Sequence, residues 1–416
     1  MQIAAESHSF VRIFDMPIQQ PRLWTYSLPA ALALLAPFNL LASLGMDIYL
    51  PVVPSMPGIL GTTPGVIQLT LTLYMIVLGV GQLLFGPLSD RIGRRPVLMC
   101  GALLFAGASF ALAWAETAWP FLALTLVQAI GASAMLVALF ATIRDVYAER
   151  PESTVIYSLM NAMLAFVPAL GPIAGALIAG GFGWRGIFVA LGLPALAMLA
   201  IALPTWHETR PIQRAGAVGG GFLPILRGPA FWAYTCAFGT AMGTFFVFFS
   251  TAPRVLMAGA GMSELQFSLA FATVALAMIV TARFAKSFVA RWGIPGSVAR
   301  GMILLLAGAA MLLAGQLWLE PSVASFILPM WLVAVGIVVT AAVTANGALQ
   351  EFSDVAGTAV ALHFCIQSLI VGVVGTVFVL VLDGDTAWPL IGYAAAMAIV
   401  TLAAIGGLTR RGKAQT

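Results

Sequence analysis

Twelve long runs of apolar residues alternate with short polar segments along the 416 residues of the chain. Most runs hold about 20 residues or more, the length of helix needed to cross the hydrocarbon core of a bilayer. The pattern therefore predicts an all-α membrane protein with twelve transmembrane helices. The predicted spans are 28–50, 66–86, 97–115, 119–143, 156–180, 186–204, 231–252, 267–285, 300–318, 323–346, 356–381 and 387–408.

Composition supports a membrane protein. Hydrophobic residues make up 61% of the chain and charged residues 8%, whereas a soluble domain carries about 25% charged residues. So few charges cannot cover a water-exposed surface, which argues against a soluble enzyme or a nucleic-acid-binding protein. We expect the lipid bilayer to surround the chain and expect no nucleic-acid partner.

Basic residues between the runs predict the orientation. An even number of spans puts both termini on one side, and that side carries seventeen of the 19 Lys and Arg residues. Only Arg185 and Arg254 lie on the opposite side. Because cytoplasmic loops are enriched in Lys and Arg, we predict that both termini are cytoplasmic. The polar first 25 residues have no signal-peptide pattern, and Met16 is an alternative start to Met1.

A polar segment divides the spans into two groups of six. It contains Gly219-Gly220-Gly221, which is typical of a flexible linker. Arg91-Ile92-Gly93 after the second span and Arg291-Trp292-Gly293 after the eighth indicate duplicated halves, an arrangement that holds substrate between two repeats. The predicted parts are a cytoplasmic segment 1–27, a six-helix half 28–204, a linker 205–230, a second six-helix half 231–408 and a cytoplasmic tail 409–416.

A charged segment separates the second and third predicted spans. It reads Gly86-Pro87-Leu88-Ser89-Asp90-Arg91-Ile92-Gly93-Arg94-Arg95-Pro96, and Arg144-Asp145 follows the fourth span. We predict a cytoplasmic gate whose ion pairs break when that side opens, with Ser353-Asp354 capping the eleventh span. The alternative is that these charges only set topology. The predicted gate residues are Gly86, Asp90, Arg91, Gly93, Arg94, Arg95, Arg144 and Asp145.

The fifth span contains Pro168-Ala169-Leu170-Gly171-Pro172-Ile173-Ala174-Gly175. Glycine and proline thin and bend a membrane helix, so that a neighbouring helix can approach closely. We predict that Gly171, Pro172 and Gly175 pack against a neighbour across the interface between the halves. Ordinary small-residue packing is the alternative interpretation.

Asp47 is the only acidic residue inside a predicted span of the N-terminal half. A charge there costs roughly 2.5–3.5 kcal/mol on insertion scales, which favours a functional role. Asn39, Ser43 and Asp47 recur every four residues and share one helix face. We predict that this face lines a central cavity and that Asp47 couples transport to protons. A helix-end carboxylate near the outer surface is the alternative, because Pro51 follows closely.

Other polar and aromatic side chains inside the spans are candidates for the same cavity. His363 and Gln367 lie four residues apart on the eleventh span, and an imidazole can exchange a proton near neutral pH, so His363 is the second proton-coupling candidate. Four phenylalanines crowd the seventh span, and we expect about half of them to contact lipid or neighbouring helices. The predicted substrate-binding residues are Asn39, Ser43, Asp47, Tyr49, Tyr74, Gln128, Phe245, Phe249 and Gln367. For the polar members, interhelical hydrogen bonds are the alternative.

The sequence indicates no enzyme. Cys100, Cys236 and Cys365 lie in apolar runs without the spacing of a metal site. The spans hold no nucleophile–base constellation, and no nucleotide-binding loop could power transport with ATP. We therefore expect a transporter without cofactor or metal.

The charged segment matches G-x-L-x-D-R-x-G-R-R-P, a signature of the major facilitator superfamily, and the motif of the fifth span resembles the drug/proton antiporter branch. SLGMDIYLPVVPSMPGILGTT, IRDVYAERPE and MGTFFVFFSTAPRVL resemble the chloramphenicol/florfenicol exporters, and this resemblance extends from Trp24 to about Tyr393. It implies the major facilitator fold and a monomer whose partners are a small-molecule drug and protons. It also implies alternating access, in which phenicol drugs leave the cytoplasm in exchange for protons.

Two positions depart from these relatives. Asn39 stands where they usually have a carboxylate, and Thr125 stands where they have an arginine. Joint loss is electrostatically reasonable, since either charge alone would be uncompensated. Asp47 would then carry coupling alone. The alternatives are weakly coupled transport, or export of another hydrophobic drug or an endogenous metabolite.

Overall fold

The computed structural model describes residues 24–147, 150, 152–210, 222–352 and 356–414. Three sequence predictions fall outside these ranges: the start of the chain at Met1 or Met16, the glycine run of the linker, and the cap at Ser353-Asp354. The described residues are helical apart from turns and short connections.

The first group of helices runs from Leu28 to Thr205. It consists of α1 (Leu28–Asp47), the short η2 (Leu50–Val52) and α2 (Met56–Ile59), α3 (Pro64–Ile92), α4 (Arg94–Ala113), α5 (Ala118–Tyr147) and α6 (Glu152–Thr205). Helices α1 and α3 begin with a proline at their first or second residue, where the missing N–H costs nothing.

The second group begins after the linker. It consists of α7 (Phe222–Leu226), α8 (Pro229–Pro253), η3 (Arg254–Gly259), α9 (Glu264–Arg283), α10 (Ala285–Trp318), η4 (Val323–Ile327), α11 (Leu328–Leu349), α12 (Ala356–Leu369), η6 (Ile370–Val374), α13 (Gly375–Val381) and α14 (Trp388–Ala414). Helices α12, η6 and α13 are consecutive, and together they form the predicted eleventh span.

Eleven helical segments of the described chain are long and apolar enough to cross a membrane. One of them, Phe166–Thr205 within α6, has 40 residues, which corresponds to about 60 Å of helix, twice the thickness of the hydrocarbon core. Gly183 interrupts it with a φ of 71°, a conformation that favours glycine. Helix α6 therefore contains the fifth and sixth predicted spans, which agrees with twelve crossings.

Two glycines of the N-terminal half each have a counterpart 200 residues later in the C-terminal half. Gly93 precedes α4 with a φ of 109°, and Gly293 interrupts α10 with a φ of 65°. A Cβ atom on Gly101 of α4 would lie 2.9 Å from the carbonyl oxygen of Gly131, and one on Gly301 of α10 would lie 2.9 Å from that of Gly336. The same close helix contact is thus built in both halves, as the repeat in the sequence suggests.

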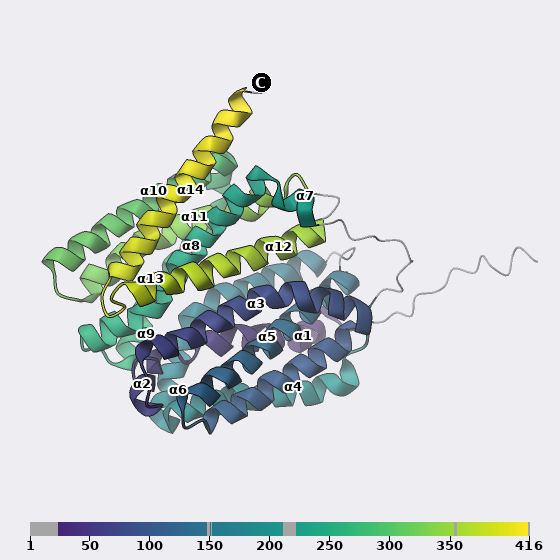
Figure 1. Ribbon diagram of the computed structural model, residues 1–416. Helices are drawn as coiled ribbons and strands as arrows, with labels where there is room; N and C mark the ends of the chain where they lie inside the picture. The colour runs from purple at the N-terminus through teal and green to yellow at the C-terminus, as the bar shows by residue number, and fades with distance from the viewer. Residues whose placement is uncertain (1–23, 148–149, 151, 211–221, 353–355, 415–416) are drawn as a thin grey trace, which may run out of the picture.

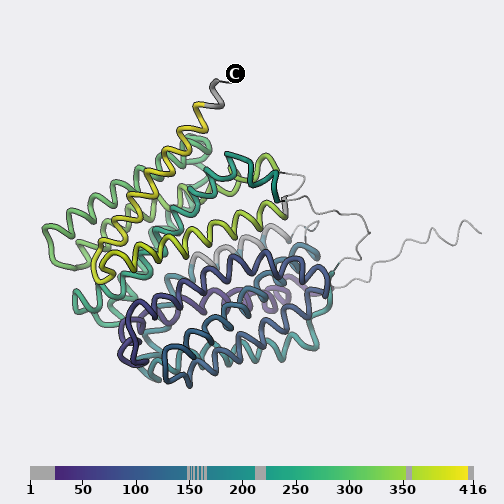
Figure 2. The backbone as a smooth tube through the Cα atoms, viewed as in Figure 1, coloured from purple at the N-terminus to yellow at the C-terminus, as the bar shows by residue number. Residues whose placement is uncertain are grey.

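The two groups lie side by side, with their helices running between two ends of the bundle (Figure 1). Figure 2 shows the purple-to-blue N-terminal group below the green-to-yellow C-terminal group. We call the end that carries Thr205 and Phe222 the linker end, and the other the far end. Helix α14 continues to Ala414, beyond the predicted span end at 408, and projects past the bundle (Figure 1).

Candidate functional site

Asp47 ends α1 near the far end of the bundle, and only 7% of the residue is exposed. Among the described residues, its carboxylate has no hydrogen-bond or ion-pair partner. The backbone of α6 lies directly against it, because a Cβ atom on Gly171 would be 3.1 Å from the Cβ atom of Asp47. An unpaired carboxyl group in this position is costly unless it exchanges protons or meets a ligand.

The other two residues of the predicted polar face are engaged inside the N-terminal half. The Asn39 side-chain amide donates to the carbonyl oxygen of Met160 at 3.1 Å, and Ser43 donates to the carbonyl oxygen of Asn39 at 2.9 Å. The Asn39 Oδ1 atom is buried without a partner. Thr125 donates to the carbonyl oxygen of Phe121 in its own helix, so the two neutral replacements are not joined by a hydrogen bond.

Tyr49, Tyr74 and Gln128 are also buried in the N-terminal half. The Tyr49 hydroxyl lies 2.5 Å from Thr70 Oγ1, and the Tyr74 hydroxyl donates to the carbonyl oxygen of Ala42 at 2.9 Å. The Gln128 amide donates to Ser109 Oγ at 2.8 Å. These groups join α1 to α3 and α4 to α5, the interhelical role that the sequence left open.

The predicted aromatic residues lie apart from these tyrosines. Phe248 stacks on Phe271 at 5.0 Å between ring centroids, and Phe245 and Phe249 contact the same ring. Phe248 and Phe249 are fully buried. Phe245, Phe248 and Phe249 therefore form a cluster with α9 inside the C-terminal half, and the structure does not bring Phe245 and Phe249 together with Tyr49.

His363 and Gln367 are buried on α12 in the C-terminal half. His363 Nδ1 lies 2.9 Å from Thr235 Oγ1, and three phenylalanine rings surround the imidazole. The Gln367 amide donates to Ser368 Oγ at 2.8 Å. His363 Nε2 and Gln367 Oε1 are buried without partners, so each can still bind a ligand atom.

Three hydrogen bonds join the two halves within the described residues, all in the part of the bundle toward the far end. Gln68 donates to Ser250 Oγ at 2.9 Å, the Thr72 and Thr376 hydroxyls lie 2.5 Å apart, and Ser268 donates to the carbonyl oxygen of Pro172 at 3.0 Å. Sequence reasoning missed these contacts. Polar residues inside apolar runs were the available signal, but their partners lie more than 90 residues away.

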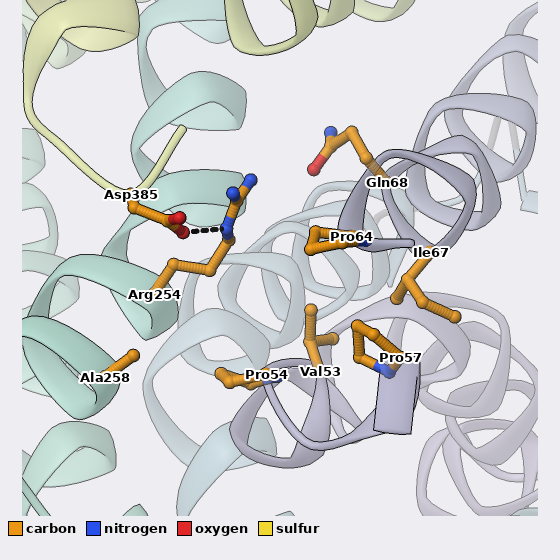
Figure 3. Close-up of a pocket in the computed structure, with 9 residues that line it drawn as sticks. All are labelled: Val53, Pro54, Pro57, Pro64, Ile67, Gln68, Arg254, Ala258 and Asp385. Carbon is orange, nitrogen blue, oxygen red and sulfur yellow. Dashed lines mark hydrogen bonds and ion pairs between the residues drawn. The ribbon is translucent and has the colours of Figure 1, made fainter. Parts of the chain in front are cut away.

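A cavity of about 80 Å³ lies at the far end between the halves. Arg254 donates to Asp385 at 2.7 Å on one side of it, and Gln68 faces this pair from α3 (Figure 3). Prolines 54, 57 and 64 line the N-terminal side (Figure 3). None of the predicted substrate-binding residues lines this cavity.

The predicted gate residues meet around Arg94, the first residue of α4. Its guanidinium contacts Asp90 at 2.5 Å, Asp145 at 2.8 Å and Ser89 at 2.7 Å. The side chains of Arg94 and Asp145 are 3% and 4% exposed. Arg144 reaches Asp145 at 3.4 Å from a largely exposed position. The network fastens α3, α4 and α5 of one half together.

The remaining gate residues have different surroundings. Arg91 and Arg95 are exposed, and Arg95 donates to the carbonyl oxygen of Leu203 at 2.6 Å instead of joining the ion pairs. Gly93 provides the turn, whereas a Cβ atom on Gly86 would meet open space. Gly86 is therefore not required for close packing in this conformation.

The small-residue motif of α6 differs in part from its predicted location. Gly171 and Gly175 lie against α1 of the same half, and a Cβ atom on Gly175 would overlap the carbonyl oxygen of Ile48. Pro172 is the member that contacts the other half, through its carbonyl oxygen and Ser268. The motif packs tightly within one half because α1 ends in a bend at Ile48–Pro51, which needs room that only glycine leaves.

We expect Gly175→Ala to destabilise the protein by about 1–3 kcal/mol, because the new methyl group must displace backbone. The measurement is thermal unfolding of the purified protein in detergent. Gly180→Ala in the same helix is the matched control, since its Cβ atom would meet no atom within 4 Å. Equal melting temperatures for the two variants would contradict the tight contact between α1 and α6.

The two groups of long apolar helices define a multi-pass membrane protein. The chain belongs to the Major Facilitator Superfamily, whose family model matches residues 35–376. The predicted fold is therefore confirmed.

Known proteins resemble the chain over different lengths. It is 50% identical over 379 residues to a chloramphenicol resistance protein of Pseudomonas aeruginosa, covering 91% of this chain and 90% of that protein. It is 34% identical over 178 residues to the multidrug resistance protein MdtL of Escherichia coli O9:H4, covering 43% of this chain and 45% of MdtL. A crystal structure of a bacterial homologue of the human lysosomal transporter Spinster, inward-facing and occupied, has a TM-score of 0.71 at 14% identity, covering 91% and 96% of the two chains.

Proposed function

We propose that this protein is an exporter of phenicol antibiotics that works by alternating access in exchange for protons. The observation that carries the proposal is the 50% identity to the Pseudomonas aeruginosa chloramphenicol resistance protein along nearly the whole of both chains. We further propose that it is a monomer in the bacterial inner membrane with both termini in the cytoplasm. The strong excess of Lys and Arg at the linker end supports this orientation.

We assign proton coupling first to Asp47. It is a buried carboxyl group without a partner among the described residues, and it ends the helix that packs against α6 beside the contact with the C-terminal half. His363 is surrounded by phenylalanine rings, and its contacts there include no carboxylate that would stabilise an imidazolium. Its free Nε2 atom suits a hydrogen bond to an uncharged drug.

Buried polar atoms without partners support substrate contacts in both halves. Asn39 Oδ1 belongs to the N-terminal half, and His363 Nε2 and Gln367 Oε1 belong to the C-terminal half. A phenicol drug carries hydroxyl and amide groups that can satisfy such atoms, while its aryl ring prefers apolar surroundings. The drug would thus bridge the halves and favour the conformation in which both contacts form.

The experiment is uptake of radiolabelled chloramphenicol and florfenicol into pump-deficient bacteria that express the chain, with and without a protonophore. We expect low accumulation that rises when the proton gradient collapses. Accumulation equal to that of cells carrying the empty vector would contradict phenicol export. Low accumulation that does not change when the protonophore is added would support phenicol export but contradict proton coupling.

Export of a different hydrophobic drug is the second candidate, supported by the similarity to a multidrug resistance protein over 178 residues. A resistance profile separates the two. Protection against another drug class without protection against phenicols would favour this candidate.

A further inference from the structure

Glu208 binds the loop between α3 and α4 from the segment that follows α6. Its Oε1 atom accepts from the backbone N–H of Arg94 at 2.8 Å, and its Oε2 atom accepts from that of Arg95 at 3.1 Å. The same carboxylate accepts from the backbone N–H groups of Thr209 and Arg210 at 3.0 and 2.9 Å. One side chain therefore ties four backbone groups, two of them more than 100 residues distant.

A carboxylate is physically suited to this place. Arg94 and Arg95 open α4, so their N–H groups have no partner within the helix. A negative charge is favoured at a helix N-terminus, and this turn carries the positive charges of Arg91, Arg94 and Arg95. The turn contributes no capping side chain of its own, because the residue before the helix is Gly93.

Gly93 has two roles in this contact. Its φ of 109° favours glycine. A Cβ atom on Gly93 would also overlap the Glu208 carboxylate, since it would lie 2.9 Å from the Glu208 Cδ atom. The absence of a side chain at Gly93 thus leaves the space that the Glu208 carboxylate occupies.

Two arginine side chains, one from each segment, add hydrogen bonds to this contact. Arg210 donates from its guanidinium to the carbonyl oxygen of Arg91, and Arg95 donates to the carbonyl oxygen of Leu203. The end of α6 and the first residues after it are therefore fastened to the gate loop by links on both sides of Glu208. The connection between the halves leaves the N-terminal half from this point.

We propose that Glu208 is a positioning residue for the cytoplasmic gate. It holds the backbone of Arg94, while Asp90, Asp145 and Ser89 hold the guanidinium of the same residue. Arg94 reaches Asp145 only when α4 begins in the right register, and Glu208 fixes where α4 begins. The segment between the halves is thereby connected directly to the gate.

The first test measures the loop without any drug, so it does not depend on the proposed substrate. A spin label is placed on Ile92→Cys, a 53% exposed position at the end of α3 next to Gly93, after the three native cysteines are replaced by alanine. We expect Glu208→Ala to mobilise the label, and Glu208→Gln to restore part of the order because its amide oxygen still accepts. The control is Glu351→Gln, an exposed carboxylate without a partner among the described residues. An unchanged spectrum for Glu208→Ala would overturn the proposal.

The second test asks whether Glu208 acts through Arg94. We expect Glu208→Ala to slow export about fivefold, the effect of losing a strong helix cap. In an Asp145→Asn background, the same change should slow export less than twofold further while still lowering the melting temperature, because the ion pair of Arg94 with Asp145 is already lost. Equal, additive losses of export in both backgrounds would show a purely structural role and overturn the proposal.

Discussion

Asp47→Asn is expected to abolish proton-driven export of chloramphenicol while leaving the protein folded in the membrane. Asparagine has nearly the same volume, and within the described residues the Asp47 carboxylate forms no hydrogen bond that would be lost. What disappears is the ability to bind and release a proton. Exchange of one uncharged drug for one proton moves one charge per cycle, so 100 mV supplies about 2.3 kcal/mol, a concentration ratio of about fiftyfold.

The measurement is drug accumulation in cells and drug exchange in liposomes. In cells, Asp47→Asn should accumulate as much drug as the empty vector. In liposomes it should still exchange labelled for unlabelled drug, because binding and the conformational change do not require the proton to move. Glu116→Gln is the control, since this exposed carboxylate lies in the loop before α5 at the far end. Wild-type, protonophore-sensitive accumulation in Asp47→Asn would remove Asp47 from the mechanism.

The location of Asp47 gives this expectation a structural basis. Its helix ends against α6, and the same turn of α6 accepts a hydrogen bond from Ser268 of α9. A change at Asp47 can therefore reach the contact between the halves through a few residues of one helix.

Elements that depend on local pattern could be predicted from the sequence. The apolar runs predicted the spans, because a segment that crosses lipid must form its backbone hydrogen bonds internally and therefore folds as a helix. The ion pair between Asp90 and Arg94 agrees with the predicted gate, because the two charges lie in the same short segment of the sequence. The break at Gly183 falls between the predicted spans 156–180 and 186–204, although helix continues on both sides of it in α6.

Contacts that depend on tertiary structure could not be predicted. Glu208 lies in a polar segment whose sequence indicates only a linker. Its partners Arg95 and Arg94 lie 113 and 114 residues earlier in the chain. Phe245 and Phe249 were predicted as pocket residues, yet both contact the ring of Phe271 in α9. Apolar periodicity shows that a side chain is buried but not which neighbour buries it.

Arg94→Ala is expected to cause the largest loss of stability among single changes at the gate. Removing one partner of a buried ion pair costs roughly 3–5 kcal/mol, because the remaining charge stays buried without compensation. Here the remaining charge is Asp145, whose side chain is 4% exposed and, among the described residues, keeps only the 3.4 Å contact with the exposed Arg144. Arg94→Lys should recover part of the loss, since an ammonium group replaces the charge but cannot bind Asp90, Asp145 and Ser89 with one planar fork. Thermal unfolding in detergent measures both.

A double variant separates stability from gating. Arg94→Met with Asp145→Asn removes both buried charges, so we expect much of the melting temperature to return. Export should stay low, because α4 and α5 are then no longer joined by the ion pair. Arg144→Ala is the control, since its 3.4 Å contact with Asp145 is 59% exposed on the arginine side and is expected to contribute less than about 1 kcal/mol. If Arg94→Ala proved as stable as Arg144→Ala, the gate hypothesis would be contradicted. These charges would then only set the topology of the chain.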